Sequence, residues 1–400
     1  MIQHAQPRVI RRGSFALNGD PVNGRPMRVA LVTNFCPHYR RPLFQELGER
    51  MDLSLLLTSA GREWYWQGER SIETGGVRTA IVPGPVKIRR ELRAGGYDAV
   101  IVGLSGRATL LAAVGSARSL DLPLVLWVGL WEHPRTLGHR LSHPMTRALY
   151  RSADAIVTYG SHVSDFIARE AKRRHGVFVA PQAVDNEFFR RDVPPRDVVA
   201  LRQELQTGGN PVVAFVGRLE ADKGVDVLLE ASARLKLPHH VVIAGSGPRA
   251  GDLQVKANAL GIGERVGFVG RVEQAQLPAL LQASDLLVLP SISTKRWREP
   301  WGLVVNEAMN AGLPVIATDA VGAAAGGLVV NDRTGLIVPQ RNAGALAFAL
   351  ESLLADQSKR ERLGAAACAH VLNWNYRAAA DAFESALAAA KAPRGRSCAS

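Results

Sequence analysis

Two glutamates, Glu299 and Glu307, lie eight positions apart in a segment that combines carboxylates with an expected helix start. Glu299 precedes a proline, which disfavours helical backbone before it, so Glu299 is expected in a loop just ahead of a helix that contains Glu307. The free N–H groups where that helix starts, near Gly302 and Leu303, form a natural anion site. Because carboxylates accept hydrogen bonds from hydroxyls, the segment suits a ligand that combines phosphate with hydroxyl groups, such as a nucleotide sugar.

A second candidate motif lies upstream and carries two cations. The apolar run 211–216 predicts a buried parallel strand, and the loop after it contains Arg218 and Lys223. Ligands of open α/β sheets bind at the carboxyl ends of strands, where this loop would lie. A guanidinium and an ammonium together suit a diphosphate. Each motif alone is also typical of solvated surface, and it is their occurrence together that favours a ligand site.

Five motifs follow one another between roughly residues 210 and 340. They are 217–224 (GRLEADKG), 241–248 (VVIAGSGP), 266–270 (VGFVG), 299–307 (EPWGLVVNE) and 331–339 (NDRTGLIVP). Their order and spacing resemble glycosyltransferase family 4, the retaining nucleotide-sugar transferases of GT-B fold, and the N-terminal half agrees more loosely. The resemblance implies an α/β protein of two doubly wound, Rossmann-like domains that face each other across a cleft.

The resemblance also implies a catalytic set and a donor site. Departure of a diphosphate puts negative charge on the leaving oxygen, which Arg218 and Lys223 would stabilise. Glu299 would bind hydroxyls of the transferred sugar, Glu307 those of the ribose, and the main chain of 266–270 would meet the base. The implied donor-binding residues are Arg218, Lys223, Gly245, Val269, Glu299, Gly302, Leu303 and Glu307.

Neither a metal nor another cofactor is expected. Fixed cations would balance the diphosphate, and the sequence has no Asp-x-Asp motif of the metal-dependent type. The resemblance further implies that the anomeric configuration of the sugar is retained.

His133 completes the implied catalytic set from the N-terminal half. It follows a predicted strand, in a region where the family often has a functional histidine. His139 and His143 are alternative matches, and an ordinary loop histidine is the competing interpretation.

The N-terminal half is expected to bind the acceptor. The loop 35–42 lacks the Gly-rich turn of many family members, and its Tyr39 and Arg40 are predicted to contact acceptor phosphate or sugar. Trp64 belongs to a Trp-Tyr-Trp run suited to sugar stacking or to an interfacial lipid. A helix start with a solvated arginine, and a core strand that uses the aromatic residues, are the alternatives.

Strands alternating with helical patterns predict two parallel sheets. The strands expected in the first half are 27–34, 52–57, 99–102, 124–128 and 155–158. The predicted divisions are a disordered segment (1–26), an acceptor domain (27–190), a nucleotide-sugar domain (191–375), a helix crossing back to the first domain (376–391) and a disordered tail (392–400).

Composition is consistent with a cytoplasmic enzyme. A chain of 400 residues suggests two domains. Cys36, Cys368 and Cys398 form no metal spacing and cannot all pair, which indicates a reducing compartment. The first 26 residues hold no secretory h-region, and no apolar run approaches the roughly 18 residues that span a membrane.

The positive charge is concentrated in the N-terminal half. Residues 1–190 carry 26 Lys and Arg against 16 Asp and Glu, with basic clusters at 89–93 and 172–174. Such clusters can hold a protein on the anionic inner face of the cytoplasmic membrane. A GC-rich genome that favours arginine explains the charge equally well. Nucleic acid is not expected as a partner, because no nucleic-acid-binding motif is present.

These observations favour a retaining glycosyltransferase of hexosyltransferase type. It would move a sugar from a nucleoside-diphosphate sugar to a saccharide or lipid-linked acceptor, in cell-envelope polysaccharide or glycolipid biosynthesis. A nucleotide-sugar epimerase or a glucan synthase of the same fold is an alternative. A non-catalytic sugar-nucleotide binding protein is another, although retention of both Glu299 and Glu307 argues against it.

Overall fold

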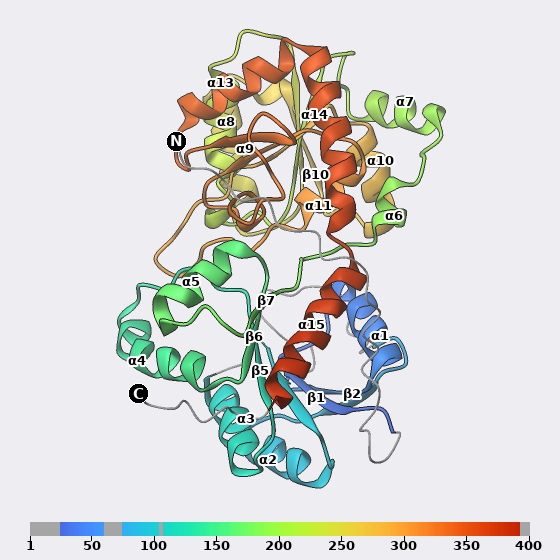
Figure 1. Ribbon diagram of the computed structural model, residues 1–400. Helices are drawn as coiled ribbons and strands as arrows, with labels where there is room; N and C mark the ends of the chain where they lie inside the picture. The colour runs from blue at the N-terminus through green and yellow to red at the C-terminus, as the bar shows by residue number, and fades with distance from the viewer. Residues whose placement is uncertain (1–24, 60–73, 104–106, 393–400) are drawn as a thin grey trace, which may run out of the picture.

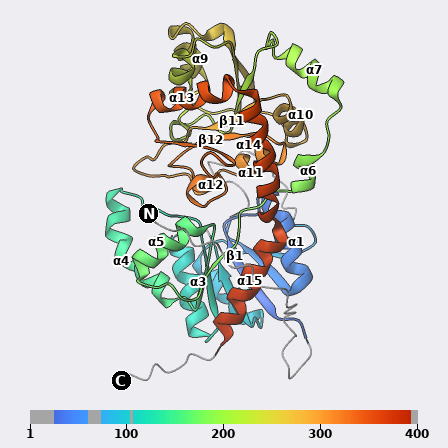
Figure 2. The same ribbon diagram turned by 45° about the horizontal axis from the view of Figure 1, so that its top comes forward.

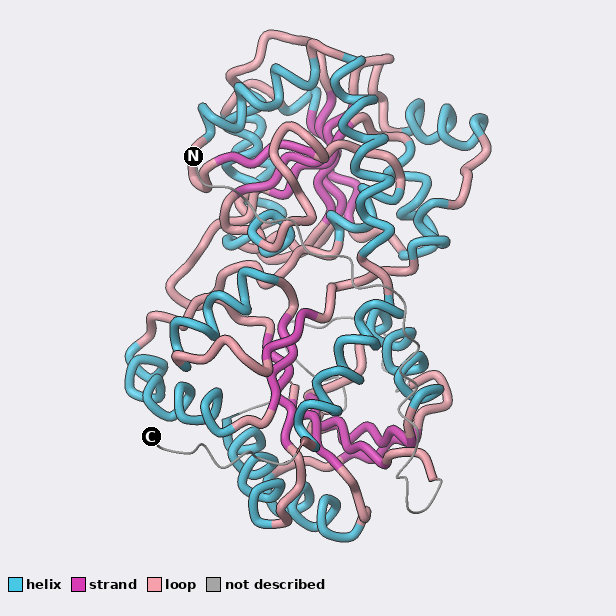
Figure 3. Tube along the Cα trace, viewed as in Figure 1, coloured by secondary structure: helices cyan, strands magenta, loops and turns pink. Residues whose placement is uncertain are grey.

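The computed structural model describes residues 25–59, 74–103 and 107–392, which form two α/β units stacked end to end (Figure 1). Each unit has a sheet of parallel strands, and Figure 3 shows the two sheets as separate groups of strands. The nearly continuous apolar runs of the sequence form strands buried on both faces, as parallel sheets require. The predicted α/β fold with two doubly wound domains is confirmed.

The described strands of the first sheet follow the order β3-β2-β1-β4-β5-β6-β7. They are β1 (Arg28–Thr33), β2 (Asp52–Leu57), β3 (Arg78–Ile81), β4 (Ala99–Val102), β5 (Leu124–Val128), β6 (Ala155–Thr158) and β7 (Val177–Val179). In the middle of the sheet, Leu31 of β1 lies opposite Leu55 of β2 and Ile101 of β4. The strand order reverses between β1 and β4, which is where ligands bind in open sheets of this kind.

Helices cover both faces of the first sheet (Figures 1 and 2). They are α1 (Arg41–Arg50), α2 (Pro85–Ala94), α3 (Arg107–Ser119), α4 (Leu137–Ser152) and α5 (Ser161–Ala171), with a 3₁₀ turn at His38–Arg40. Helix α2 packs against α3 and α4 against α5, whereas α1 lies on the other face.

The described strands of the second sheet follow the order β10-β9-β8-β11-β12-β13. They are β8 (Val212–Val216), β9 (His240–Ala244), β10 (Val266–Gly270), β11 (Leu286–Leu289), β12 (Val315–Thr318) and β13 (Gly335–Val338). The helices are α8 (Val225–Ala233), α9 (Ala250–Ala259), α10 (Leu277–Gln282), α11 (Val304–Asn310), α12 (Gly322–Ala325), α13 (Ala343–Leu354) and α14 (Gln357–His370). Short 3₁₀ turns lie at Ala221–Lys223, Gly263–Arg265, Gln274–Gln276 and Val371–Asn373.

Among the described residues, the chain crosses between the two sheets twice. Helices α6 (Asn186–Arg190) and α7 (Pro195–Glu204) lead into the second sheet, and α15 (Tyr376–Lys391) returns to the first. Helix α15 packs beside α1, as Figure 2 shows, where Arg50 pairs with Asp381 at 2.6 Å and with Glu384 at 2.8 Å. The two units are therefore joined by two chain segments.

Each sheet has its own apolar core. Phe383 and Leu387 of α15 belong to the core of the first sheet, where the Phe383 ring meets Trp127 edge-on with ring centres 5.2 Å apart. Val184 and Phe189 precede the predicted division at residues 190 and 191, yet they pack in the core of the second sheet. The predicted disordered ends, residues 1–26 and 392–400, lie almost entirely outside the described residues. No helix of the described chain is long and apolar enough to cross a lipid bilayer.

Candidate active site

The loops at the carboxyl ends of the two sheets meet across the domain boundary. Trp131 and Arg135 follow β5, and Lys295 and Glu299 follow β11. The main-chain N–H of Arg135 donates to the carbonyl of Lys295 at 2.8 Å, and the Trp131 Nε1–H donates to the carbonyl of Glu299 at 3.0 Å. These two hydrogen bonds bring together the loop after β5, where His133 is predicted, and the loop after β11, which contains Glu299.

Lys223 and Glu299 form an ion pair at the carboxyl edge of the second sheet. Their side chains are only 12% and 10% exposed, and the hydroxyl of Ser291 donates to the same carboxylate oxygen at 3.3 Å. Gly224 has φ +65°, and a Cβ there would lie 2.1 Å from the carbonyl oxygen of Pro290. Only glycine therefore lets the Lys223 turn approach the end of β11 closely enough to form the pair.

Arg218 lies further out, at the end of β8. Its side chain is 39% exposed and its guanidinium donates to Glu220 at 2.7 Å. Gly245 lies behind it with φ +154°, and a Cβ there would come within 1.8 Å of the carbonyl oxygen of Gly217. Gly245 thus allows the loops after β8 and β9 to touch, and its predicted donor contact stays a prediction.

Glu307 is the fourth residue of α11 and is partly exposed. Burial raises the pKa of its carboxyl to about 7. The helix begins directly after Gly302 and Leu303, as predicted, and Gly302 has φ +92°. The side chain of Asn306 holds α11 towards the domain crossing by donating to the carbonyl of Gln182 at 2.9 Å.

A cavity of about 440 Å³ lies between the two domains beside Glu307. Its wall combines residues of both domains and of the two crossing segments. They are His38, Tyr39 and Pro42, then Val184, Asp185, Phe188 and Phe189, then Glu273, Gln274, Ala275 and Glu307, and finally Tyr376. The Tyr376 hydroxyl donates to the carbonyl of Tyr39 at 3.2 Å. Tyr39, predicted for the acceptor, and Glu307, predicted for the donor, therefore line one cavity. Val269, also predicted for the donor, is exposed on β10.

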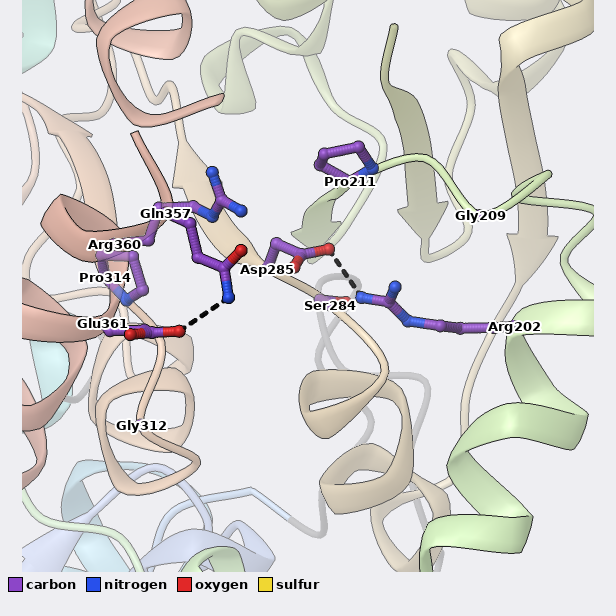
Figure 4. A pocket seen from close by; sticks show the side chains of 10 residues that line it. All are labelled: Arg202, Gly209, Pro211, Ser284, Asp285, Gly312, Pro314, Gln357, Arg360 and Glu361. Atoms are coloured by element: carbon purple, nitrogen blue, oxygen red, sulfur yellow. Dashed lines mark hydrogen bonds and ion pairs between the residues drawn. The ribbon is translucent and has the colours of Figure 1, made fainter. Parts of the chain in front are cut away.

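A second cavity, of about 390 Å³, lies at the opposite edge of the second sheet (Figure 4). Residues that precede β8, β11 and β12 line it, so it lies at the amino ends of these strands. Within its wall, Arg202 forms an ion pair with Asp285 at 2.6 Å, and the Gln357 amide donates to Glu361 at 2.8 Å. It contributes nothing to the site that contains Lys223 and Glu299.

The three candidate histidines gather at the start of α4. The Nε2 atom of His133 lies 2.8 Å from the carbonyl oxygen of His139, so this nitrogen carries the proton. The ring of His133 stacks on His143 with centres 4.3 Å apart, and His143 in turn lies 2.7 Å from the carboxylate of Glu170. In neutral His133, Nδ1 is then the nitrogen that can accept a proton.

Arg40 and Trp64 are the other two residues predicted to bind the acceptor. Arg40 is only 7% exposed, and its guanidinium lies 4.5 Å over the Trp127 ring and 2.5 Å from the hydroxyl of Tyr159. Its planar cation is thus held inside the first domain by two aromatic side chains, and its predicted contact with the acceptor stays a prediction. Trp64 lies outside the described residues.

Trp131 and His162 lie at the site, although nothing in the sequence identifies them as site residues. Both belong to the first domain, and both donate hydrogen bonds to the main chain at Glu299 and Pro300. No local pattern signals such contacts, because each joins residues more than 130 positions apart.

A family model and several curated proteins are similar to this chain. Residues 199–370 match the family model described as glycosyl transferases group 1. The chain is 31% identical to alpha-D-kanosaminyltransferase of Streptomyces kanamyceticus over 62% of its own length and 65% of that protein. It is 29% identical to a GDP-mannose-dependent alpha-(1-6)-phosphatidylinositol monomannoside mannosyltransferase of Mycobacterium tuberculosis, over 85% of this chain and 92% of the relative.

Solved structures show the same fold at lower identity. The crystal structure of HepE from Anabaena in complex with UDP superposes with a TM-score of 0.74 at 19% identity. The superposition covers 90% of this chain and 99% of HepE. The chain therefore carries a glycosyl transferases group 1 domain at residues 199–370, within a protein of the GT-B fold.

Proposed function

We propose that the protein transfers a sugar, with retention of configuration, from a nucleoside-diphosphate sugar to a saccharide or lipid-linked acceptor. The observation that carries this proposal is the nearly buried pair of Lys223 and Glu299, which faces the first domain at the carboxyl edge of the second sheet. Glu307 on the neighbouring interdomain cavity supplies a second carboxylate for hydroxyl groups. A cation and two carboxylates in one site match a ligand made of diphosphate, sugar and ribose.

Each group then has a role in the transfer. Lys223 and Arg218 stabilise the diphosphate as the bond from the anomeric carbon to its oxygen breaks and that oxygen leaves with the electron pair. Glu299 orients the sugar and Glu307 the ribose. The acceptor oxygen attacks the same face of the sugar, and its proton passes to the departing diphosphate, with His133 beside the reacting groups. No metal or other cofactor is required by this arrangement of fixed charges.

Similar proteins support the nucleotide-sugar class. The mycobacterial relative is named for GDP-mannose, and structures of HepE contain UDP or UDP-glucose. The names of relatives that act on a phosphatidylinositol mannoside and on inositol phosphate favour a role in glycolipid or polysaccharide synthesis for this chain as well.

Thermal unfolding of the purified protein with UDP, GDP, ADP and their sugar conjugates tests the proposal. A ligand at 100 times its Kd is expected to stabilise the protein by about 2.7 kcal/mol and to raise Tm by several degrees. The shift should persist in EDTA, since Arg218 and Lys223 provide the positive charge. A folded sample that responds to no member of the panel would contradict the proposal and favour a non-catalytic protein.

We propose in addition that the protein works on an anionic membrane surface, which would present a lipid-linked acceptor. Helix α4 exposes Leu137 and Leu141, at 72% and 76%, and both lie on one helical face with the exposed Pro144. Arginines flank this face, and α4 contains no acidic residue. An apolar stripe beside a row of arginines matches the interface of an anionic bilayer. The helix starts just after the loop that touches Glu299, so bound lipid would lie next to the site.

Vesicle sedimentation tests this membrane face. We expect wild-type protein to bind vesicles that contain phosphatidylglycerol, and to bind them more weakly as the salt concentration increases. It should not bind vesicles of pure phosphatidylcholine. The double variant Leu137→Ser, Leu141→Ser should lose binding, whereas Phe348→Ser, which removes a side chain of equal exposure (76%) from the second domain, should not. Equal binding by both variants would refute the assignment, and a concentration-dependent dimer lost only in the leucine variant would assign the face to a second copy.

A further inference from the structure

The segment Glu299–Trp301 is held from both domains. Within the second domain, the N–H of Gly322 donates to the Glu299 carbonyl at 3.1 Å and the N–H of Ala323 donates to the Trp301 carbonyl at 2.8 Å. From the first domain, the Trp131 Nε1–H donates to the same Glu299 carbonyl at 3.0 Å. His162 reaches the next residue, with Nε2 at 3.2 Å from the carbonyl oxygen of Pro300.

His162 is fixed in one orientation. It is buried at the start of α5, its ring meets Trp131 edge-on with centres 4.8 Å apart, and the Trp301 ring lies 6.0 Å away on another side. Gly326 packs against the Nδ1 side of the ring, where a Cβ would come within 2.9 Å of Nδ1. Because a carbonyl only accepts, Nε2 must carry a proton, and burial lowers the pKa of this histidine to about 4, which leaves it neutral at physiological pH.

Trp131 is equally constrained. The guanidinium of Arg298 lies 3.6 Å over its ring and also reaches Glu132 at 3.3 Å. Arg298 immediately precedes Glu299, so this stacking joins the two loops once more, beside the hydrogen bond to the Glu299 carbonyl.

Within the described chain, it is therefore only the main-chain end of Glu299 that contacts the first domain. Its carboxylate pairs with Lys223 of the second domain, and its carbonyl accepts one hydrogen bond from each domain. A shift of the first domain would move the Glu299 main chain and turn its carboxylate relative to Lys223, because only a short side chain separates the two ends.

We propose that Trp131 and His162 are positioning residues, which set the direction of the Glu299 carboxylate according to how the two domains are docked. The inference rests on the proposed function, in which Glu299 orients the transferred sugar. Nucleotide binding in the second domain should then be independent of these two residues. Transfer of the sugar should require the first domain to hold the Glu299 segment in place.

Three variants test the proposal through kcat and nucleotide affinity. Trp131→Phe keeps an aromatic ring and removes the N–H, and His162→Leu removes the donor. Each should lower kcat about tenfold, as for one lost hydrogen bond, with the Kd for the nucleoside diphosphate within about twofold of wild type. His162→Gln places an amide N–H where Nε2 lies and should restore most of the lost kcat. Trp297→Phe, an exposed tryptophan of the same loop, is the control and should change neither quantity.

Hydrogen–deuterium exchange supplies a readout that needs no activity. Trp131→Phe and His162→Leu should speed exchange at 132–136 and 296–302, whereas His162→Gln and Trp297→Phe should not. If wild-type protein transfers no sugar, the proposed function fails, and exchange still decides whether the two residues hold the segment. Unchanged kcat and exchange in Trp131→Phe would overturn the inference. So would an equal loss of kcat and nucleotide affinity, or a His162→Gln variant as impaired as His162→Leu.

Discussion

Replacement of Lys223 by alanine is expected to lower turnover about 10²–10³-fold, the usual effect of removing one group that stabilises charge in a transition state. Lys223 is the less exposed of the two cations assigned to the diphosphate, and its contact with Glu299 holds it at the edge that faces the first domain. Steady-state transfer of a radiolabelled sugar at saturating donor measures the change. Turnover near that of wild type would remove Lys223 from its assigned role.

The same variant is expected to be less stable. Loss of Lys223 leaves the Glu299 carboxylate nearly buried with Ser291 as its remaining partner, and breaking a buried pair in this way costs about 3–5 kcal/mol. Urea unfolding at the temperature of the transfer assay measures this loss and shows whether the variant is folded when turnover is compared. Lys256→Ala is the matched control, because Lys256 pairs with Glu230 in a more exposed position at 2.5 Å. That change should cost less than about 1 kcal/mol and leave turnover unaffected.

Nucleotide affinity is expected to rise with pH and to level off above about pH 7, where the Glu307 carboxyl of the free protein ionises. Ribose hydroxyls donate to a carboxylate, so bound nucleotide favours the ionised form, and protons are released on binding. Calorimetric titration between pH 5.5 and 8.5 measures the affinity. Glu307→Gln should weaken binding about 10- to 100-fold at pH 8 and remove the pH dependence. A variant that keeps the wild-type slope would show that another group titrates.

The contribution of Glu307 to the stability of the folded protein should fall as pH rises, whereas nucleotide affinity should rise. The pKa of Glu307 in the folded protein lies above the ordinary value of 4.5. The stabilisation that comes from its protonated form is therefore complete below about pH 4.5 and is lost as pH rises through about 7. Glu307→Gln lacks this loss and should be more stable than wild type at pH 8 but not at pH 4.5. The exposed Glu187, at the nearby start of α6, offers Glu187→Gln as a control without such a crossover.

Central strands were predictable from the sequence, and edge strands were not. The runs that became β1, β2, β4, β5 and β6 are apolar almost throughout, because both of their faces are covered. The strands β3 and β7 lie at the two edges of the first sheet. A strand with one neighbour needs little burial, and Arg78–Ile81 and Val177–Val179 accordingly hold no fully buried residue.

The sequence predicted those parts of the site that lie within single loops. Lys223 and Glu299 were assigned to one donor site through the family resemblance, and in the structure they follow neighbouring strands of one parallel sheet. The side-chain directions were not legible. Arg40 was predicted to contact the acceptor, with a solvated arginine as the alternative, and only the rings of Trp127 and Tyr159, far along the chain, explain its interior position. The contacts of Trp131 and His162 depend in the same way on how two separately folded domains meet.

The return of α15 to the first sheet has a consequence for synthesis on the ribosome. Phe383 and Leu387 complete the core of the first domain, although the strands of that domain are translated before those of the second. The core of the second domain ends at Val371, so all of its residues precede α15 in the chain. The first domain, although its strands are made first, can therefore complete its apolar core only after α15 has been translated.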